Sequence, residues 1–267
     1  MLKLKDKVAV VTGGGRGIGR AICLAFAREG ADLVIAADEE SEVKAVAEHV
    51  TTMGRKALPC QLDITRPHEV QKLVRRTFET FDRINILVNN AGVVGKRSFV
   101  HQSDDDIWRR TIEVNLIGTY YMIKAFLPKI MELEQGRVIN IASISGKQAS
   151  PTNSAYSASK HGVIGLTRTV AVEMGLLGLP GITINAICPG VANTGMITGP
   201  GGVLDELSRL TQTPPEVVLE ERIKPMALQK RLVEPEEIAE MAVYLASDDA
   251  RGITGQAINV CAGTVFY

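Results

Sequence analysis

A tyrosine and a lysine, Tyr156 and Lys160, lie four residues apart in a segment with helical periodicity. Residues at this spacing project from the same face of a helix, about 6 Å apart along its axis. A nearby ammonium stabilises a phenolate and lowers the pKa of the phenol from its ordinary value near 10. The pair is therefore suited to move a proton, as an acid toward a carbonyl that is being reduced or as a base toward an alcohol that is being oxidised.

A serine, Ser143, directly follows the apolar run 137–142, which predicts a strand. A hydroxyl at the carboxyl end of a central strand can donate a hydrogen bond to a substrate oxygen on which negative charge develops. This arrangement indicates polarisation of a substrate and not nucleophilic attack. A surface tyrosine, a solvated lysine and a helix-capping serine are each common by themselves, and only their combination predicts a catalytic site.

A glycine-rich loop, Thr12-Gly13-Gly14-Gly15-Arg16-Gly17-Ile18-Gly19, separates the first predicted strand from the first predicted helix. Glycine permits a tight turn and a close approach of the backbone to a ligand, and the free N–H groups at a helix start favour a pyrophosphate. The strand before the loop and the helix after it distinguish this site from an ordinary flexible turn.

Short apolar runs alternate with longer segments of helical period, the pattern of a parallel sheet with helices on both faces. We predict one domain, residues 1–267, of the α/β class with a doubly wound sheet of about seven strands. The predicted strands are 7–12, 33–37, 56–61, 84–89, 137–142, 182–187 and 257–260, and the predicted helices are roughly 17–29, 39–53, 66–81, 104–131, 154–175 and 234–245. Residues 191–225, rich in glycine and proline, are expected to form one long covering loop within the domain.

The composition excludes several other classes of protein. The chain has 267 residues, 45% hydrophobic and 22% charged, with 30 basic and 30 acidic side chains, so its net charge is zero. This balance argues against a nucleic-acid partner, and no apolar stretch approaches the roughly 20 residues that a membrane helix requires. With no signal-peptide pattern, we expect a cytoplasmic protein without a membrane partner. Four scattered cysteines indicate buried side chains and neither a disulfide framework nor a metal site.

Together these motifs resemble the short-chain dehydrogenase/reductase family. The resemblance runs from Lys7 to about Gly263 and rests on Thr12-Gly13-x-x-x-Gly17-x-Gly19, Asn89-Asn90-Ala91-Gly92, Asn115, Ser143, Tyr156-x-x-x-Lys160, and Pro189-Gly190 followed by Thr194. It implies a single-domain Rossmann-type fold. It also implies an NAD(P)-dependent enzyme that transfers hydride between a nicotinamide cofactor and a secondary alcohol or ketone.

The resemblance also assigns roles to single residues. Tyr156 would act as the acid or base, Lys160 would lower its pKa, and Asn115 would hold a water against Lys160. Ser143 is selected over Ser145 because it lies three residues before the glycine and thirteen before the tyrosine. The implied cofactor contacts are Gly13, Arg16, Gly17, Ile18, Gly19, Asp38, Asp63, Ile64, Asn90, Ala91, Gly92, Tyr156, Lys160, Pro189, Gly190, Val191 and Thr194.

Two charged residues bear on the choice between NAD and NADP. The position most often acidic in NAD-dependent relatives matches Ala37, and Asp38 follows it; Arg16 occupies a position where a basic residue often accompanies NADP. A carboxylate near a 2′-phosphate would be a like-charge contact, so Asp38 favours NAD, with NADP as the alternative. Two plainer interpretations stay open: a solvated Arg16, and an Asp38 that caps the following helix.

The substrate class stays open among sugars or polyols, hydroxysteroid-like alcohols and 3-oxoacyl compounds. Val203, Leu207 and Leu210 share one helical face, which could line an apolar pocket or pack in a core. The long helices 104–131 and 154–175 resemble the family's subunit interface and imply a homotetramer or a homodimer. The alternative function is a non-catalytic dinucleotide-binding sensor on the same fold; a methyltransferase would have no use for the Tyr156 and Lys160 pair.

Overall fold

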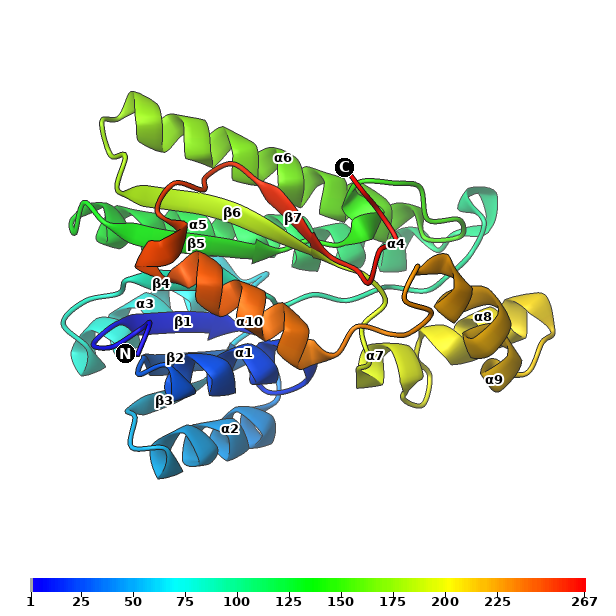
Figure 1. The fold of residues 1–267 in the computed structure, drawn as a ribbon, viewed down its shortest axis with the longest axis horizontal. Coiled ribbons are helices and arrows are strands. Elements are labelled where there is room, and N and C mark those ends of the chain that lie inside the picture. Colours follow the sequence, from blue (N-terminus) through cyan, green and yellow to red (C-terminus); the bar gives the residue numbers. More distant parts are fainter. Residues whose placement is uncertain (1) are drawn as a thin grey trace.

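The computed structural model describes residues 2–267, and its centre is a single seven-stranded parallel sheet (Figure 1). The strands lie in the order β3-β2-β1-β4-β5-β6-β7. Their bounds are β1 Val8–Thr12, β2 Asp32–Ala37, β3 Ala57–Gln61, β4 Ile86–Asn89, β5 Gly136–Ile141, β6 Ile182–Pro189 and β7 Ala257–Val260. All pairings are parallel, which confirms the predicted doubly wound α/β sheet.

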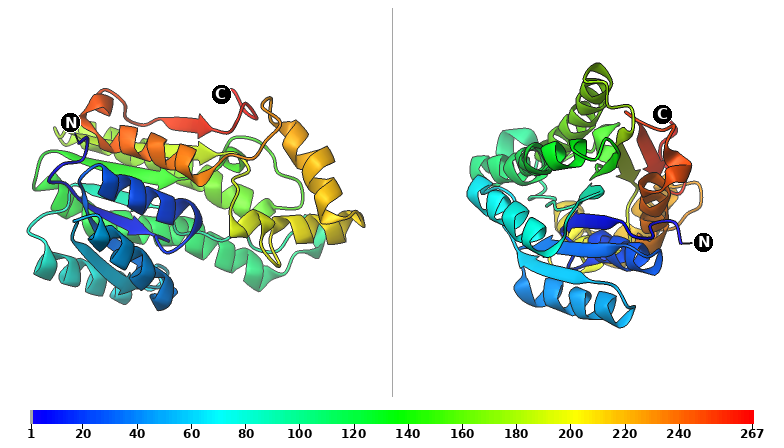
Figure 2. Two further views of the ribbon diagram at one scale, coloured as in Figure 1. Left: turned by 60° about the horizontal axis from the view of Figure 1, so that its bottom comes forward. Right: turned by 90° about the vertical axis from the view of Figure 1, so that its left-hand side faces the viewer.

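Helices cover both faces of the sheet, and each face has its own core (Figure 2). One face carries α1 Gly17–Arg28, α2 Glu40–Thr52 and α10 Pro235–Ala246, and the other carries α3 Pro67–Thr80, α5 Thr119–Met131 and α6 Ser154–Leu176. Successive side chains of a strand point to opposite faces, so Ala9 and Val11 of β1 pack in the first core while Val8 and Val10 pack in the second. This two-sided burial explains why the strands are continuous apolar runs.

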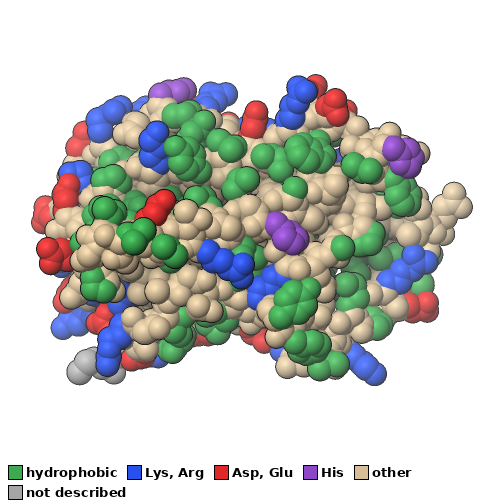
Figure 3. Space-filling model, turned by 90° about the horizontal axis from the view of Figure 1, so that it is seen from above, with side chains coloured by type: hydrophobic (Ala, Val, Ile, Leu, Met, Phe, Trp, Pro, Cys, Tyr) green, Lys and Arg blue, Asp and Glu red, His purple; other side chains and the backbone are tan. Residues whose placement is uncertain are grey.

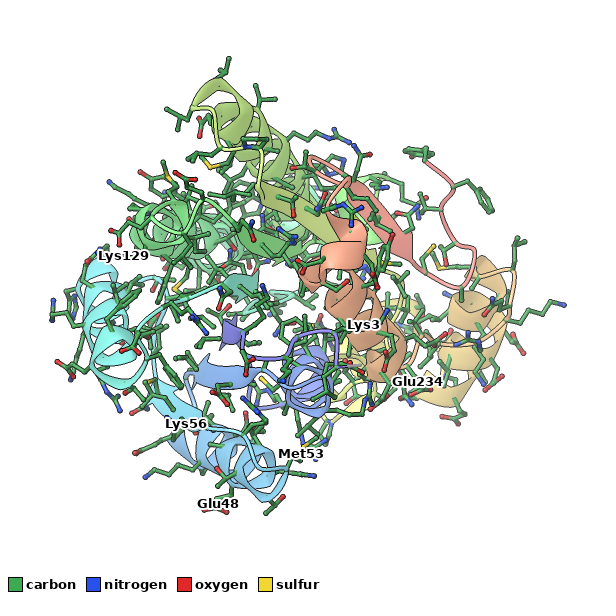
Figure 4. All side chains as sticks on the ribbon, turned by 60° about the vertical axis from the view of Figure 1, so that its left-hand side comes forward. Lys3, Glu48, Met53, Lys56, Lys129 and Glu234 are labelled. Carbon is green, nitrogen blue, oxygen red and sulfur yellow. The ribbon has the colours of Figure 1, made fainter. Side chains whose placement is uncertain are left out.

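The outer surfaces of the helices are polar or only partly apolar. Figure 4 shows side chains filling both layers, with Glu48 on the outer side of α2 and Met53 directly after that helix. The four cysteines are all unpaired and buried, as the sequence predicted. In residues 2–267 we find no helix whose length and hydropathy would suffice to cross a membrane.

The predicted helix 104–131 consists of three consecutive pieces. It comprises α4 Asp105–Ile112, a π-helical stretch η2 Glu113–Gly118, and α5. Asp104 caps α4, because its carboxylate accepts hydrogen bonds from the N–H groups of Asp106 and Ile107, both at 3.0 Å. A π-helical turn inside a helix is rare and often marks a functional position, and this one contains Asn115.

Residues 191–225 contain several short helices joined by short connections, where one long loop was expected, and their role as a cover over the substrate stays a prediction. The helices are α7 Gly195–Thr198, α8 Val203–Thr211, α9 Pro215–Val217, η4 Val218–Ile223 and η5 Lys224–Met226, and they lie beyond the carboxyl end of the sheet (Figure 1). Leu204, Val218, Ile223 and Leu232 form a small core of their own, and Leu207 packs against it. Of the predicted apolar face, Leu207 therefore packs within this segment, Leu210 is 37% exposed, and a role in lining a substrate pocket stays a prediction.

Candidate active site

A cleft of about 400 Å³ opens at the carboxyl ends of the strands, where chain connections leave β1 and β4 in opposite directions. Open parallel sheets bind ligands at such a switch point. Most of the residues expected to form the site line this one cleft: Gly13, Arg16, Gly17, Ile18, Asp38, Asp63, Ile64, Asn90, Ala91, Gly92, Ser143, Tyr156, Lys160, Pro189, Gly190 and Thr194. Gly19, Asn115 and Val191 are not among its lining residues.

The glycine loop is shaped by close backbone contacts. Gly13 has φ +62°, a conformation that side chains rarely adopt, and a Cβ on it would lie 2.8 Å from Nδ2 of Asn90. A Cβ on Gly19 would lie 2.0 Å from the carbonyl oxygen of Gly13, so Gly19 supports the loop from behind. Helix α1 starts at Gly17, and its N-cap residue Arg16 makes no side-chain capping bond. The first N–H groups of α1 therefore face a cradle that fits a pyrophosphate.

Asn90 and Thr12 join the end of β4 to this loop. The side-chain amide of Asn90 donates to the carbonyl oxygens of Thr12 and Gly13, each at 3.0 Å. In return the Thr12 hydroxyl accepts from the N–H groups of Asn90 and Ala91 at 3.0 and 3.1 Å. Asn90 thus holds the phosphate cradle in shape, in addition to lining the cleft.

Two aspartates lie at the far end of the cleft. The Asp63 carboxylate accepts from the N–H and hydroxyl of Thr65 at 2.9 and 2.7 Å. Burial raises the pKa of Asp63, but the bonds from Thr65 and the charge of Arg110 outweigh it and hold that pKa below its ordinary value. Asp38 is exposed and does not cap α2, because the N-cap residue of that helix is Glu39. The capping interpretation of Asp38 is therefore wrong.

Tyr156 lies in the first turn of α6, and Lys160 lies one turn later on the same side. The Lys160 Nζ atom is 5.6 Å from the centre of the Tyr156 ring and donates to the carbonyl oxygen of Ile141, at the end of β5, at 2.8 Å. The lysine side chain is buried, and this burial lowers its pKa to about 8. The structure thus puts a buried amine beneath the phenol within one cleft.

The expected lowering of the Tyr156 pKa is wrong for this structure. Burial raises the pKa of the phenol, and the hydrogen bond with Ser143 and the charge of Arg97 only partly oppose that rise. The sequence showed the lysine beside the tyrosine but not the burial of the two groups, partial for Tyr156 and nearly complete for Lys160, which penalises each charged form. At neutral pH Tyr156 is therefore a protonated acid.

Ser143 has the geometry of a hydrogen-bond donor to the cleft. It follows β5 and is buried, and its hydroxyl oxygen accepts from the N–H of Ser145 at 3.0 Å. A hydroxyl has one proton to donate and two lone pairs. Since a lone pair receives the Ser145 N–H, the proton remains free to point toward Tyr156 or a bound oxygen. Ser145 does not line the cleft.

Asn115 is fully buried within the π-helical stretch, and its side chain acts as a clamp. Its amide nitrogen donates to the carbonyl oxygen of Val93 at 2.9 Å and to the Ser159 hydroxyl at 3.0 Å, and its oxygen accepts from the Val93 N–H at 2.8 Å. Gly92 lies beside it: a Cβ there would be 3.1 Å from the Asn115 oxygen and 3.6 Å from Lys160 Nζ. The side chain thus positions the wall next to Lys160, and its role in a proton relay stays a prediction.

Two residues at this site were missed by sequence reasoning. Arg97 donates to the carbonyl oxygen of Pro151 at 3.1 Å and to the Thr152 hydroxyl at 3.3 Å, which brings its charge near Tyr156. Glu42, on α2, lines the cleft and pairs with Arg16. Arg97 is far in sequence from Tyr156, and Glu42 is far from Arg16, so no local sequence pattern could have identified either residue. In residues 2–267 no group of three His, Cys, Asp or Glu side chains could hold a metal ion.

Comparisons with known proteins agree on one family. The family model described as "short chain dehydrogenase" matches residues 7–199. The chain is 36% identical to a 3-oxoacyl-[acyl-carrier-protein] reductase of a Synechocystis species, with all of both chains covered. A crystal structure of actinorhodin polyketide ketoreductase with NADPH superposes with a TM-score of 0.91 at 34% identity over all of both chains. A crystal structure of carveol dehydrogenase from Mycobacterium avium in complex with NAD superposes with a TM-score of 0.90 at 28% identity over 99% of each chain.

The buried Lys160 leads to a prediction about stability. The pKa of Lys160 in the folded protein, about 8, lies below the pKa of a lysine in the unfolded chain. The free-energy cost of burying the charge is therefore fully present below pH 8, and it disappears as the pH rises to the pKa of the unfolded chain. Lys160→Met should therefore raise the free energy of unfolding at pH 7 by up to about 3 kcal/mol, less about 1 kcal/mol for the lost hydrogen bond to Ile141.

Denaturant unfolding at pH 7 and pH 10.5 measures this difference, and the stabilisation should shrink at the higher pH. Lys5→Met, which removes an exposed lysine, provides the control and should show no such pH dependence. A stability difference for Lys160→Met that stays equal at both pH values would contradict the buried-charge interpretation.

Proposed function

The chain belongs to the short-chain dehydrogenase/reductase family, and from this premise we propose that it reduces ketones to secondary alcohols, or the reverse, with NAD as its preferred cofactor. The observation that carries the proposal is the meeting of Ser143, Tyr156 and Lys160 with the glycine loop in one cleft. A non-catalytic sensor would need the cradle but not these three side chains. Family members act on CH–OH or C=O groups, so the general reaction class is established.

In the proposed mechanism a bound reduced nicotinamide dinucleotide supplies the hydride. The first N–H groups of α1 would bind its pyrophosphate, Asp38 its adenosine ribose and Asp63 its adenine side, while Pro189, Gly190 and Thr194 would line its nicotinamide end. Cβ atoms on Gly13 or Gly19 would collide with neighbouring protein atoms and distort the loop, so the glycines keep the cradle in a shape that fits a pyrophosphate.

The protein's own groups handle the proton. Ser143 donates a hydrogen bond to the substrate oxygen, and Tyr156 donates its phenol proton to that oxygen as negative charge develops. Lys160, with a pKa of about 8, carries positive charge at neutral pH and stabilises the phenolate left behind. In the oxidation direction the same groups act in reverse, with the phenolate as base.

The preference for NAD follows from the charges at the adenosine end. Asp38 is exposed in the cleft and engaged in no helix cap, so its carboxylate is available to a ribose hydroxyl. A 2′-phosphate at the same place would meet like charge. The two structural neighbours hold NADPH and NAD respectively, so they support a nicotinamide cofactor. The preference for NAD over NADP rests on the charge of Asp38.

The substrate is a small carbonyl or alcohol, for which we keep the three classes of sugar or polyol, hydroxysteroid-like alcohol and 3-oxoacyl compound. The names of the 3-oxoacyl reductase and the polyketide ketoreductase support the last class. 3-Oxoacyl thioesters are therefore the first substrates to assay.

The assembly we propose is a homotetramer. Val172 and Leu176, one turn apart on α6, are 62% and 82% exposed, and Leu177 after them is 60% exposed. The face over α6 shows hydrophobic side chains interspersed among charged ones (Figure 3). Large exposed apolar side chains that are neighbours on one helix, as Val172, Leu176 and Leu177 are, favour an interface.

Replacement of the phenol tests the catalytic assignment. Tyr156→Phe should reduce turnover by about 10² to 10⁴-fold, because the acid is gone, while the dissociation constant for NADH should change by less than about twofold. Reduced-nicotinamide absorbance gives the turnover, over a panel of 3-oxoacyl thioesters, sugars and steroids, and NADH fluorescence gives the binding. Tyr244→Phe, on α10, is the matched control. A wild-type protein that binds NADH but converts nothing in the panel would favour the sensor.

The raised pKa of Tyr156 predicts opposite pH profiles for the two directions. Alcohol oxidation needs the phenolate, so its kcat/KM should rise from pH 7 to pH 10, whereas ketone reduction needs the protonated phenol and should not rise. Initial rates at fixed ionic strength measure both. An oxidation rate independent of pH in this interval would contradict Tyr156 as the base.

The assembly prediction concerns mass in solution. Light scattering coupled to size exclusion should give about four times the 28.8 kDa of one chain. Leu176→Asp should lower that mass, because it places charge in the proposed interface, and Met53→Asp, directly after α2, should not. A wild-type mass equal to one chain would refute the proposal.

A further inference from the structure

We infer that Glu42 is a specificity-determining residue that holds Arg16 away from a 2′-phosphate and so disfavours NADP. This inference rests on the proposed NAD preference and adds to it a residue outside the family motifs described above. It depends on an ion pair, on the packing of that pair against the glycine loop, and on the charges that surround the adenosine end of the cleft.

The ion pair joins two elements that contribute to the cleft. Oε1 of Glu42, in the first turn of α2, lies 3.2 Å from Nη1 of Arg16, the residue before α1. Both side chains line the cleft, and Asp38 lines it with them. Within residues 2–267 the Arg16 guanidinium therefore pairs with a carboxylate of the protein itself.

Glu42 is held in this place by packing against the loop. A Cβ on Gly15 would lie 2.7 Å from Cβ of Glu42 and 3.0 Å from its Oε2 atom. The absence of a side chain at Gly15 thus lets Glu42 lie directly on the backbone of the phosphate loop. Its side chain is 30% exposed, whereas that of Arg16 is 71% exposed, so the glutamate is the fixed member of the pair.

The charges around this place explain the consequence. Asp38 and Glu42 contribute two carboxylates and Arg16 one guanidinium, so the group is negative as a whole. A phosphate monoester carries about −1.5 to −2 charges at pH 7, and it would meet this excess of negative charge. A ribose 2′-hydroxyl carries no charge and can donate to a carboxylate. Neutralising Glu42 removes one repulsive carboxylate and at the same time frees Arg16 to bind the phosphate bidentately.

The test uses fragments of the cofactor, so that binding is measured without catalysis. Isothermal titration gives the dissociation constants of 5′-AMP and of adenosine 2′,5′-bisphosphate, which differ in the 2′-phosphate. Glu42→Gln should bind the bisphosphate about tenfold more tightly than wild type, and 5′-AMP within about twofold. Glu48→Gln, an exposed glutamate on the same helix, loses the same charge and should change neither constant.

A second variant, Arg16→Ala, separates two effects of Glu42: the effect through its ion pair with Arg16, and the direct repulsion between its carboxylate and the 2′-phosphate. In Arg16→Ala, the Glu42→Gln change should lose most of its gain for the bisphosphate, because the freed guanidinium is absent. A gain that persists at full size would overturn the role assigned to the ion pair. Should Glu42→Gln fold poorly by circular dichroism, Glu42→Asp retracts the carboxylate from Arg16 and should give a smaller gain in the same direction.

Failure of this inference differs from failure of the proposed cofactor. Suppose that the wild type binds 5′-AMP more tightly than the bisphosphate, and that Asp38→Ala strengthens bisphosphate binding while Glu42→Gln does not. In that case Glu42 does not determine specificity, and the NAD preference stands. If wild type binds the bisphosphate more tightly than 5′-AMP, the NAD preference itself is wrong and the inference falls with it.

Discussion

The site depends on the hydrogen bond from the Lys160 ammonium to the carbonyl oxygen of Ile141. That bond joins the first turns of α6 to the end of β5 and holds a charge beneath the Tyr156 ring in a place without solvent. Burial lowers the pKa of Lys160 to about 8 even with this bond, so the buried ammonium destabilises the fold while it supplies a positive charge next to the reacting groups. Ser143 follows the same strand, which sets it opposite the phenol without any flexible connection.

The surrounding contacts keep this arrangement rigid. Asn115 holds the Val93 segment with both atoms of its amide, and Gly92 beside it leaves room for Lys160. On the other side of the cleft, Asn90 and Thr12 fix the glycine loop to the end of β4. Because both clamps attach to the segment that follows β4, the phosphate cradle and the proton-transfer groups share one support. A site with reacting groups on rigid elements loses little entropy when substrate and cofactor bind.

The sequence predicted those features that depend on periodicity or on short spacing. All seven strands could be recognised, and the inner ones were the clearest because burial on both faces makes them continuous apolar runs. Tyr156 and Lys160 share a face because four residues make about one turn. The π-helical stretch around Asn115 leaves no local pattern, and in 191–225 only α8 showed helical spacing in the sequence, because the glycines and prolines of that segment indicate turns. The direction of the Tyr156 pKa and the partners Glu42 and Arg97 required three-dimensional neighbours, since burial and distant charges decide them.

The electrostatics at the two ends of the cleft have opposite character. At the reacting end the positive charges of Lys160 and Arg97 lie near a phenol that must become an anion during ketone reduction. At the adenosine end three carboxylates, those of Asp38, Glu42 and Asp63, outnumber the guanidinium groups of Arg16 and Arg110. A dinucleotide spanning these ends would therefore meet cations where negative charge develops and carboxylates where its ribose hydroxyls can donate.

The most direct test of this account is a crystal structure of the protein with NADH. The account predicts the pyrophosphate on the loop 13–19 and the nicotinamide beside Tyr156 and Ser143, so that a carbonyl hydrogen-bonded to both hydroxyls would have its carbon about 3 to 3.5 Å from the hydride donor. A dinucleotide bound with its nicotinamide outside this cleft, or with Lys160 turned away from Tyr156, would contradict it.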